Sequence, residues 1–171
     1  MNLNKKLIVL ALASTVSISA SAAVETFTAS VTALTEPTIV NGTPIVFGTM
    51  GLAVGSACVM DNAGGVTGDC DATDVNIAVG GITISNLITS SNISITVATG
   101  VGANVTYTPV YDIAGAVAAV SDAPADIAQS VTVAAGDADI VLTNFGTMSV
   151  DTTLDAGIAY TADYNVTVVF E

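Results

Sequence analysis

The sequence predicts an all-β protein, an antiparallel immunoglobulin-like β-sandwich of about eight to ten short strands with one disulfide loop. Three observations support this fold class: apolar and polar residues alternate along much of the chain, β-branched residues are abundant, and turn residues interrupt the runs about every ten residues. Hydrophobic residues make up 51% of the chain. Many of them are Val and Ile, in which disordered chains are poor.

The first 22 residues have the pattern of a removable export signal. Lys5 and Lys6 form a positive segment, an apolar stretch follows at 7–13, and Ala20-Ser21-Ala22 matches a signal peptidase site. The apolar stretch is shorter than the ~20 residues that a membrane span needs. We therefore expect residues 1–22 to be removed and residues 23–171 to form a single exported β-sandwich domain. We expect it in the periplasm, at the cell surface or outside the cell, with no integral membrane insertion.

The alternating runs give the expected strands in order. After the leader, Phe27, Ala29, Val31 and Ala33 share one face. Further strands are expected at 45–47, 75–79 and 82–84, with a Gly80-Gly81 turn before the last of these, and then at 93–97, 105–111, 131–133 and 140–142. Pro109 favours an edge strand because proline donates no backbone hydrogen bond. The Ala-rich stretch 113–126 could form a short helix, although Gly115 and Pro124 disfavour one.

The last run is the most regular of all. One face carries Tyr160, Ala162, Tyr164, Val166, Val168 and Phe170, and the other face is polar from Thr161 to Thr167. Strict alternation over this length is typical of a strand with one buried face. We therefore expect the Tyr160–Phe170 strand to turn this apolar face toward the core.

The charge distribution excludes several classes of function. No Lys, Arg or His follows Lys6, so the side chains of residues 23–171 carry a charge of 0 − 15 = −15. Without cations the protein cannot neutralise a nucleic-acid backbone, and no His or Lys can activate a Ser or Thr nucleophile. A glycoside hydrolase would use paired carboxylates, but the aromatic surfaces that usually bind sugars are scarce here. We expect no nucleic-acid partner and no enzymatic activity.

The two cysteines, Cys58 and Cys70, bracket a Gly-rich loop. In an exported chain an even cysteine count predicts a disulfide, which for a loop of this size contributes about 3 kcal/mol on the chain-entropy model. A zinc site would lack further Cys or His ligands. The pair is therefore expected to form a structural disulfide.

Four aspartates, Asp61, Asp69, Asp71 and Asp74, cluster in and after this loop. Carboxylates and backbone carbonyls are the ligands that Ca²⁺ prefers, so these residues are calcium candidates. The EF-hand spacing is absent, and Asp also favours turns for purely local reasons. Apart from calcium, we expect no cofactor.

The two ends of the exported chain carry a family resemblance. An alternating first strand, the Ile45–Met50 segment (IVFGTM), Gly157 and a long last strand with a penultimate aromatic residue resemble a group of secreted bacterial sandwiches. This group includes spore coat protein U-like domains and chaperone–usher pilins. In pilins a periplasmic chaperone pairs with the C-terminal strand, and an N-terminal segment is donated to the next subunit. The resemblance implies these roles for Tyr160–Phe170 and for Thr26–Ala33.

These observations predict a secreted structural or surface-assembly protein of a Gram-negative bacterium, with self-association or a periplasmic chaperone as its partner. Two alternatives stay open. Both end strands could pair within one closed monomeric sandwich, which would serve as an adhesive or ligand-binding module stabilised by calcium. A small outer-membrane β-barrel is disfavoured, because four Tyr and four Phe are too few for two aromatic girdles.

Overall fold

The computed structural model describes residues 30, 36–136 and 139–171. The expected leader and, apart from Ser30, the expected first strand at Thr26–Ala33 lie outside the described residues. Residues 34–171 form one compact unit, and the following description concerns this unit.

The described residues contain twelve strands and no helix, and each strand is antiparallel to its sheet neighbours. The predicted all-β antiparallel sandwich is therefore confirmed. Several strands are only two to four residues long, because the longer alternating runs are interrupted. In chain order the strands are β1 (Thr38–Thr43), β2 (Ala57–Met60), β3 (Val66–Gly68), β4 (Gly80–Ser85), β5 (Asn92–Val97), β6 (Gly100–Gly102), β7 (Val105–Ala114), β8 (Val120–Pro124), β9 (Gln129–Thr132), β10 (Ile140–Val150), β11 (Ala162–Asp163) and β12 (Val166–Phe170).

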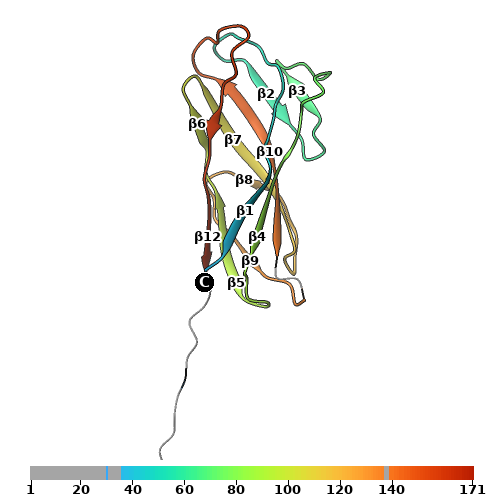
Figure 1. Cartoon of the computed structure of the whole chain (residues 1–171), viewed down its shortest axis with the longest axis vertical. Helices are drawn as coiled ribbons and strands as arrows, with labels where there is room; N and C mark the ends of the chain where they lie inside the picture. Colours follow the sequence, from blue (N-terminus) through green and yellow to red (C-terminus); the bar gives the residue numbers. More distant parts are fainter. Residues whose placement is uncertain (1–29, 31–35, 137–138) are drawn as a thin grey trace, which may run out of the picture. The chain divides into compact units, whose positions relative to one another are not determined.

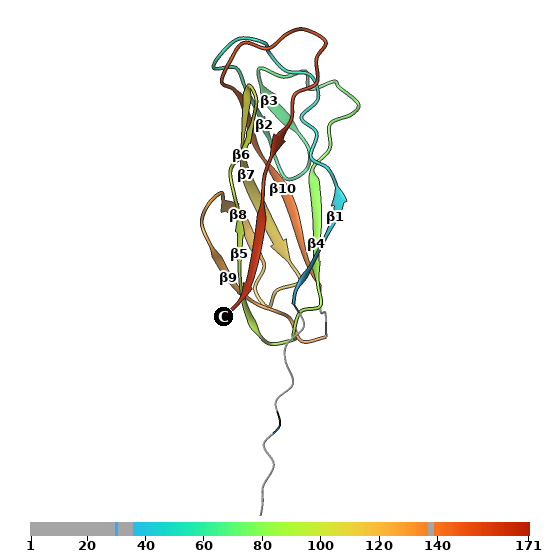
Figure 2. The same ribbon diagram turned by 60° about the vertical axis from the view of Figure 1, so that its left-hand side comes forward.

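The strands form two sheets (Figure 1). The larger sheet has the order β1-β4-β10-β7-β6-β11, with β2 attached to β10, β3 attached to β2, and β8 attached to β7. The smaller sheet has the order β12-β5-β9. The C-terminal run crosses between the two, because β11 pairs with β6 and β12 pairs with β5. Figure 2 shows this run passing along one side of the sandwich.

Two main clusters of buried side chains hold the sandwich together. The first lies between the sheets and includes Ile84, Ile95 and Leu142, each 0% exposed. The second surrounds Tyr107 and Phe145. Fully burying one such side chain contributes about 1.5–3 kcal/mol, so these clusters supply much of the driving force for folding.

The predicted disulfide between Cys58 and Cys70 is present, with the two Cα atoms 5.4 Å apart. It joins β2 to the residues that follow β3, and Cys58 is completely buried in the second cluster. The disulfide therefore closes the β2–β3 hairpin, while the ladder between β2 and β10 attaches this hairpin to the rest of the larger sheet.

The expected strand at 75–79 is wrong, because residues 75–76 form a turn and only Ala78 pairs, in an isolated bridge with Val46. The Asp74 carboxylate accepts a hydrogen bond from the Asn76 N–H at 3.0 Å, which closes a local turn around Val75 and competes with strand pairing. Val75 is 93% exposed as a result. The Gly80-Gly81 turn is also wrong, because both glycines belong to β4. A Cβ atom on Gly80 would lie 3.3 Å from the Cβ atoms of Asn144 and Ile45, so a glycine allows this close approach.

Pro109 does not mark an edge strand. Its strand, β7, pairs with β10 along its whole length and with β6 and β8 on its other side. Pro109 falls between the residues that pair with β6 and those that pair with β8, where an N–H group would have no strand to bond. The stretch 113–126 contains the end of β7 and all of β8, with no helix.

Candidate functional site

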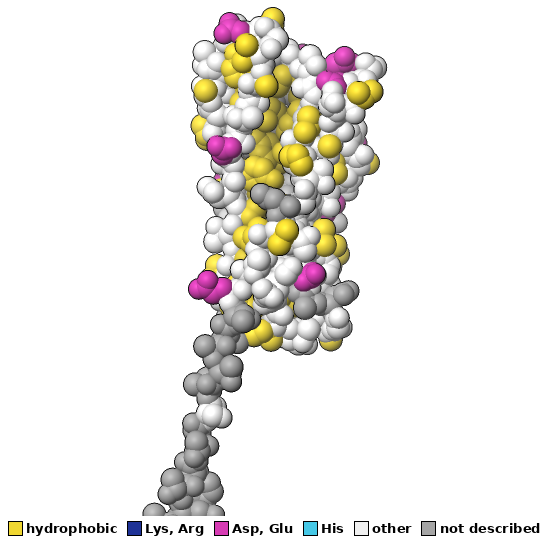
Figure 3. Space-filling view, viewed as in Figure 1, with side chains coloured by type: hydrophobic (Ala, Val, Ile, Leu, Met, Phe, Trp, Pro, Cys, Tyr) yellow, Lys and Arg dark blue, Asp and Glu magenta, His cyan; other side chains and the backbone are white. Residues whose placement is uncertain are grey.

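An apolar groove lies between β1 and the C-terminal run. It encloses about 860 Å³, and Figure 3 shows a band of hydrophobic surface in this region. One wall includes Ile39, Thr43 and Ile45, and the opposite wall includes Tyr160, Ala162, Tyr164 and Val166. Buried or half-buried side chains, among them Phe47, Tyr107 and Met148, also line it.

Two strand edges border this groove. In the described part of the chain β12 pairs only with β5, and β1 pairs only with β4. Each strand therefore presents a second edge whose backbone N–H and C=O groups have no ladder partner among the described residues. Such an edge is a template for a further strand.

The C-terminal run turns alternate side chains toward the groove and the core. Tyr160, Ala162, Tyr164, Val166, Val168 and Phe170 are all half-buried, and the residues between them are exposed. Val166, Val168 and Phe170 pack against the first core cluster, but none of them is fully buried. These inward side chains therefore keep a part of their apolar surface that no described residue covers.

The β1 wall of the groove is even less covered than the wall formed by the C-terminal run. Ile39 is 41% exposed although it lines the groove, and Val40, on the other face of β1, is 50% exposed. Beyond β1, the expected strand at 45–47 is reduced to a single bridge, in which Val46 and Ala78 exchange backbone hydrogen bonds at 2.8 and 3.0 Å. Among the described residues, the β1 wall of the groove therefore has a strand partner, β4, on one side only.

Aromatic side chains form the deepest part of the groove. The Tyr107 ring packs edge-on against Phe47 and Tyr164, with ring centroids 5.7 and 5.2 Å apart. The Tyr107 hydroxyl donates a hydrogen bond to the Phe145 carbonyl at 2.7 Å. Burial raises the pKa of Tyr107 well above its ordinary value, and Tyr164 adds to this rise. The hydroxyl therefore stays a neutral donor at physiological pH.

Sequence reasoning identified one wall of this groove but not its aromatic floor. The alternation in residues 160–170 indicated the C-terminal wall. Phe47 and Tyr107 belong to runs at 45–47 and 105–111 that predict ordinary strands, so the sequence does not single them out as residues of a groove. The expected donated strand residues Phe27, Ala29, Val31 and Ala33 lie outside the described residues.

The four calcium candidates serve mainly as local turn acceptors. Asp61 accepts hydrogen bonds from the N–H groups of Ala63 and Gly65, at 2.9 and 2.7 Å. Asp69 accepts a long bond of 3.4 Å from the Ala57 N–H. These carboxylates close the loops around the disulfide.

The other two calcium candidates, Asp71 and Asp74, also accept hydrogen bonds within local turns. The Thr73 hydroxyl, 2.6 Å from Asp71, lowers the pKa of this carboxyl group, with help from the Thr73 N–H. Bonds from the backbone and side chain of Asn76, and then from Thr49, lower the pKa of Asp74. Turn hydrogen bonds are therefore sufficient to keep both groups ionised.

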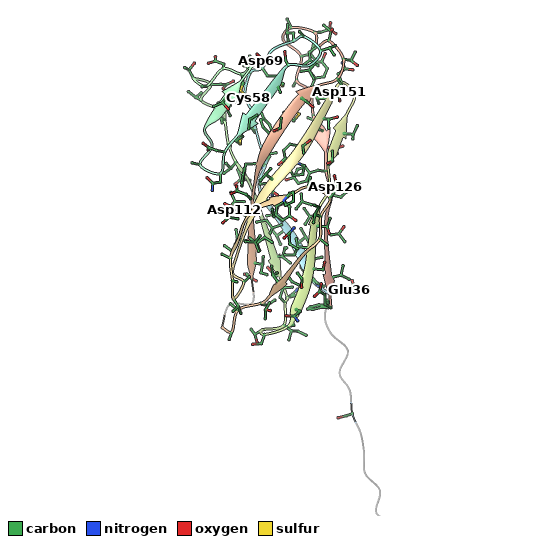
Figure 4. All side chains as sticks on the ribbon, turned by 180° about the vertical axis from the view of Figure 1, so that it is seen from behind. Glu36, Cys58, Asp69, Asp112, Asp126 and Asp151 are labelled. Carbon is green, nitrogen blue, oxygen red and sulfur yellow. A yellow bond between two sulfur atoms is a disulfide. The ribbon has the colours of Figure 1, made fainter. Side chains whose placement is uncertain are left out.

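Among the residues that the structure describes, no three Asp, Glu, Cys or His side chains gather as a metal site would require. The acids labelled in Figure 4 lie at separate places along the sandwich, from Glu36 at one end to Asp69 near the other. Calcium binding by Asp61, Asp69, Asp71 and Asp74 stays a prediction, which a calcium titration followed by melting temperature would test.

No helix within the described ranges is long and apolar enough to cross a membrane. Comparisons with protein-family models, with curated proteins and with solved structures found no match to this chain. The resemblance to spore coat protein U-like domains and pilins therefore stays a prediction based on the two ends of the sequence.

Proposed function

We propose that this protein is an exported structural subunit that assembles by strand donation. The segment Thr26–Ala33 of one copy enters the groove of another copy and pairs with its free strand edges. The single observation that carries this proposal is the apolar groove bounded by unpaired edges of β1 and β12.

The segment and the groove match in length and polarity. Eight extended residues span about 26 Å at ~3.3 Å per residue, enough to follow the whole of β1, which has six residues. The segment alternates, so Phe27, Ala29, Val31 and Ala33 can face the groove while Thr and Ser face solvent. Each buried Val or Phe side chain would contribute about 1.5–3 kcal/mol, and the ladder bonds would fix the register.

The groove supports a structural rather than a catalytic role. Among the described residues that line it, the only charged side chains are Asp155 and Asp163. No His, Lys or Arg lies there to move a proton or to bind an anion, whereas a strand needs only apolar surface and backbone partners.

The disulfide fits the exported compartment of this proposal, because such bonds persist in oxidising surroundings. Before assembly, copies of the protein with an exposed apolar groove and free strand edges would aggregate in the periplasm. A chaperone that supplies a temporary strand is therefore the second partner we propose, and it would use the same two edges.

Two tests address the proposal. Deleting residues 24–34 should abolish polymers of the exported chain, as seen by size exclusion and negative-stain microscopy. A synthetic peptide of residues 24–34 should bind the shortened chain, whose groove lacks a donor.

Matched peptides sharpen the second test. A Phe27→Asp peptide should bind at least tenfold more weakly, because it would bury a charge in the groove. A Thr28→Asp peptide, altered on the opposite face, should bind almost normally. If the shortened chain binds none of these peptides, the groove does not accept this strand. If the intact chain stays monomeric at high concentration, even after unfolding and refolding, it is not an assembly subunit.

A further inference from the structure

We propose that the end of the sandwich opposite the C-terminus is a membrane-contact tip, which binds the surface of a neutral lipid bilayer. The tip consists of two loops, residues 51–55 before β2 and residues 154–159 before β11. Figures 1 and 2 show both loops at this end. The inference goes beyond strand donation, because it concerns these loops and not the strand edges of the groove.

The two loops of the tip expose apolar side chains. Leu52 is 42% exposed, Val54 is 61% exposed and Ile158 is 60% exposed. The remaining residues of the loops are Gly or Ala, apart from the buried Leu154 and the exposed Asp155. Figure 3 shows hydrophobic side chains on the surface at this end. Because exposed apolar side chains that gather at one place mark contact sites, the tip is a candidate for binding a partner.

Backbone hydrogen bonds hold the two loops in place. The Leu154 N–H donates to the Leu52 carbonyl and so joins one loop to the other, at 2.9 Å. The Gly55 N–H donates to the Val150 carbonyl, also at 2.9 Å, and ties the first loop to the end of β10. Loops that are already ordered lose little conformational entropy when they bind.

The exposed apolar area is too small for a stable complex with another protein. Even an aromatic side chain buries only about 150–250 Å². Leu52, Val54 and Ile158 are smaller and partly covered. Each partner of a stable protein complex buries ~800 Å². A bilayer requires no matching surface, because apolar side chains of a peripheral protein can enter its interfacial region to a depth of about 5–10 Å.

The charge of the protein selects a neutral bilayer. Of the 15 acidic residues only Glu25 precedes Glu36, so 15 − 1 = 14 acids belong to residues 36–171, which contain no Lys, Arg or His. An anionic bilayer or a second copy would therefore repel this part of the chain. A zwitterionic bilayer has no net charge, and the exposed Asp155 can stay among its headgroups, which carry ammonium groups.

The test uses the absence of Trp from the chain, because a single introduced Trp then reports only on its own surroundings. Val54→Trp places the reporter at the tip, at a residue that does not line the groove. Val117→Trp is the control, because Val117 is 70% exposed and belongs to neither loop. It follows β7, which begins beside Val150 near the tip and ends away from it.

Vesicles of pure phosphatidylcholine should shift the emission of Val54→Trp in the exported chain to shorter wavelength and leave that of Val117→Trp unchanged. In vesicle flotation, Val54→Asp should lower the bound fraction at least tenfold, because a charge replaces an apolar side chain that enters the bilayer. Val117→Asp should change it less than twofold. Both sites are on the surface, so the variants should fold, which circular dichroism checks. Replacing half of the lipid by anionic phosphatidylglycerol should weaken binding at low salt.

Two results would overturn membrane contact: no emission shift of Val54→Trp with vesicles, or equal losses of flotation in the two Asp variants. A shift of Val54→Trp that grows with protein concentration without lipid would assign the tip to contacts between copies, and would also overturn it. Binding of the 24–34 peptide to the shortened chain is measured without vesicles. Failure of the membrane proposal therefore leaves strand donation standing, and failure of strand donation leaves the tip to be judged by flotation.

Discussion

Strands β5 and β12 are direct neighbours with the same alternating pattern, yet their environments differ. Val97 pairs with Val166, Ile95 with Val168, and Ile93 with Phe170. The three β5 side chains are 0% exposed, whereas their three partners on β12 are only half-buried. The described part of β5 has β9 and β12 as neighbours, while β12 has only β5.

This difference teaches that alternation specifies which face of a strand turns inward but not how well that face is covered. Coverage depends on the second neighbour and on the opposite sheet, which lie far away in the sequence. Inward but half-covered side chains therefore mark the place where the described part of the sandwich leaves apolar surface uncovered.

The prediction with the largest expected effect compares the same substitution, Val to Ala, at two paired residues of β5 and β12. In the chain lacking residues 24–34, Val97→Ala should lower the free energy of unfolding by about 2–3 kcal/mol, because it removes buried methyl groups and leaves a cavity. Val166→Ala should cost less than about 1 kcal/mol, because its side chain already contacts solvent. Urea unfolding measures both values. Equal costs would contradict the difference in burial that defines the groove.

Much of the fold was predictable because its signals are local. The alternation in residues 160–170 and the even cysteine count of a chain with an expected export signal needed no knowledge of distant neighbours. The faces of the C-terminal run and the Cys58–Cys70 bond follow directly from them.

The rest depends on how strands change partners. At Gly146, whose φ of 122° favours glycine, β10 stops pairing with β4 and begins pairing with β2. Pro109 lies opposite this residue, at the point where β7 also changes its neighbour. Neither change has a local pattern, so sequence reasoning interpreted Pro109 as an edge signal and gave no indication that Tyr107 would form the floor of the groove.

The second prediction uses two residues of β12 that point to opposite faces. Val166→Lys should weaken binding of the 24–34 peptide to the shortened chain at least tenfold, because Val166 lines the groove and an ammonium group there must be desolvated when the strand enters. Val169 is 55% exposed on the outer face, so Val169→Lys should change the affinity less than twofold. Calorimetric titration compares the two. Similar losses would show that the peptide binds elsewhere.

The third prediction concerns the aromatic floor, which belongs to the covered part of the molecule. Tyr107→Phe removes the hydroxyl that donates to the Phe145 carbonyl, and it should cost about 1 kcal/mol of stability. The cost should be the same with and without bound 24–34 peptide, because this bond is already buried in the empty groove. Urea unfolding at saturating peptide checks this. A cost that appears only with peptide would mean that the floor forms when the strand enters.

The smallest expected effect concerns the hydrogen bonds that hold the end of β5, the well-covered strand. Just after β5, the Thr99 hydroxyl and N–H donate to the Asp126 carboxylate at 2.6 and 3.0 Å, and the Asp126 N–H donates to the Val97 carbonyl at 2.9 Å. The Thr99 hydroxyl, followed by the Thr99 N–H, lowers the pKa of Asp126 below its ordinary value of 3.8. Because the folded-state pKa is the lower one, this carboxylate stabilises the fold above about pH 4, and the contribution disappears as pH falls through the lowered pKa.

Thr99→Val removes the stronger of these two donors, so the pKa of Asp126 should rise toward 3.8. Stability should then depend less steeply on pH at the acidic end, with little change near neutrality beyond the lost hydrogen bond. Carboxyl carbon NMR titration measures the pKa, and urea midpoints between about pH 2 and pH 5 measure the slope. Thr96→Val, on β5 itself, is the control and should leave the Asp126 titration unchanged. An unchanged Asp126 pKa in Thr99→Val would show that the Thr99 hydroxyl does not hold this carboxylate, and the coverage of β5 would then rest on packing by its two neighbours alone.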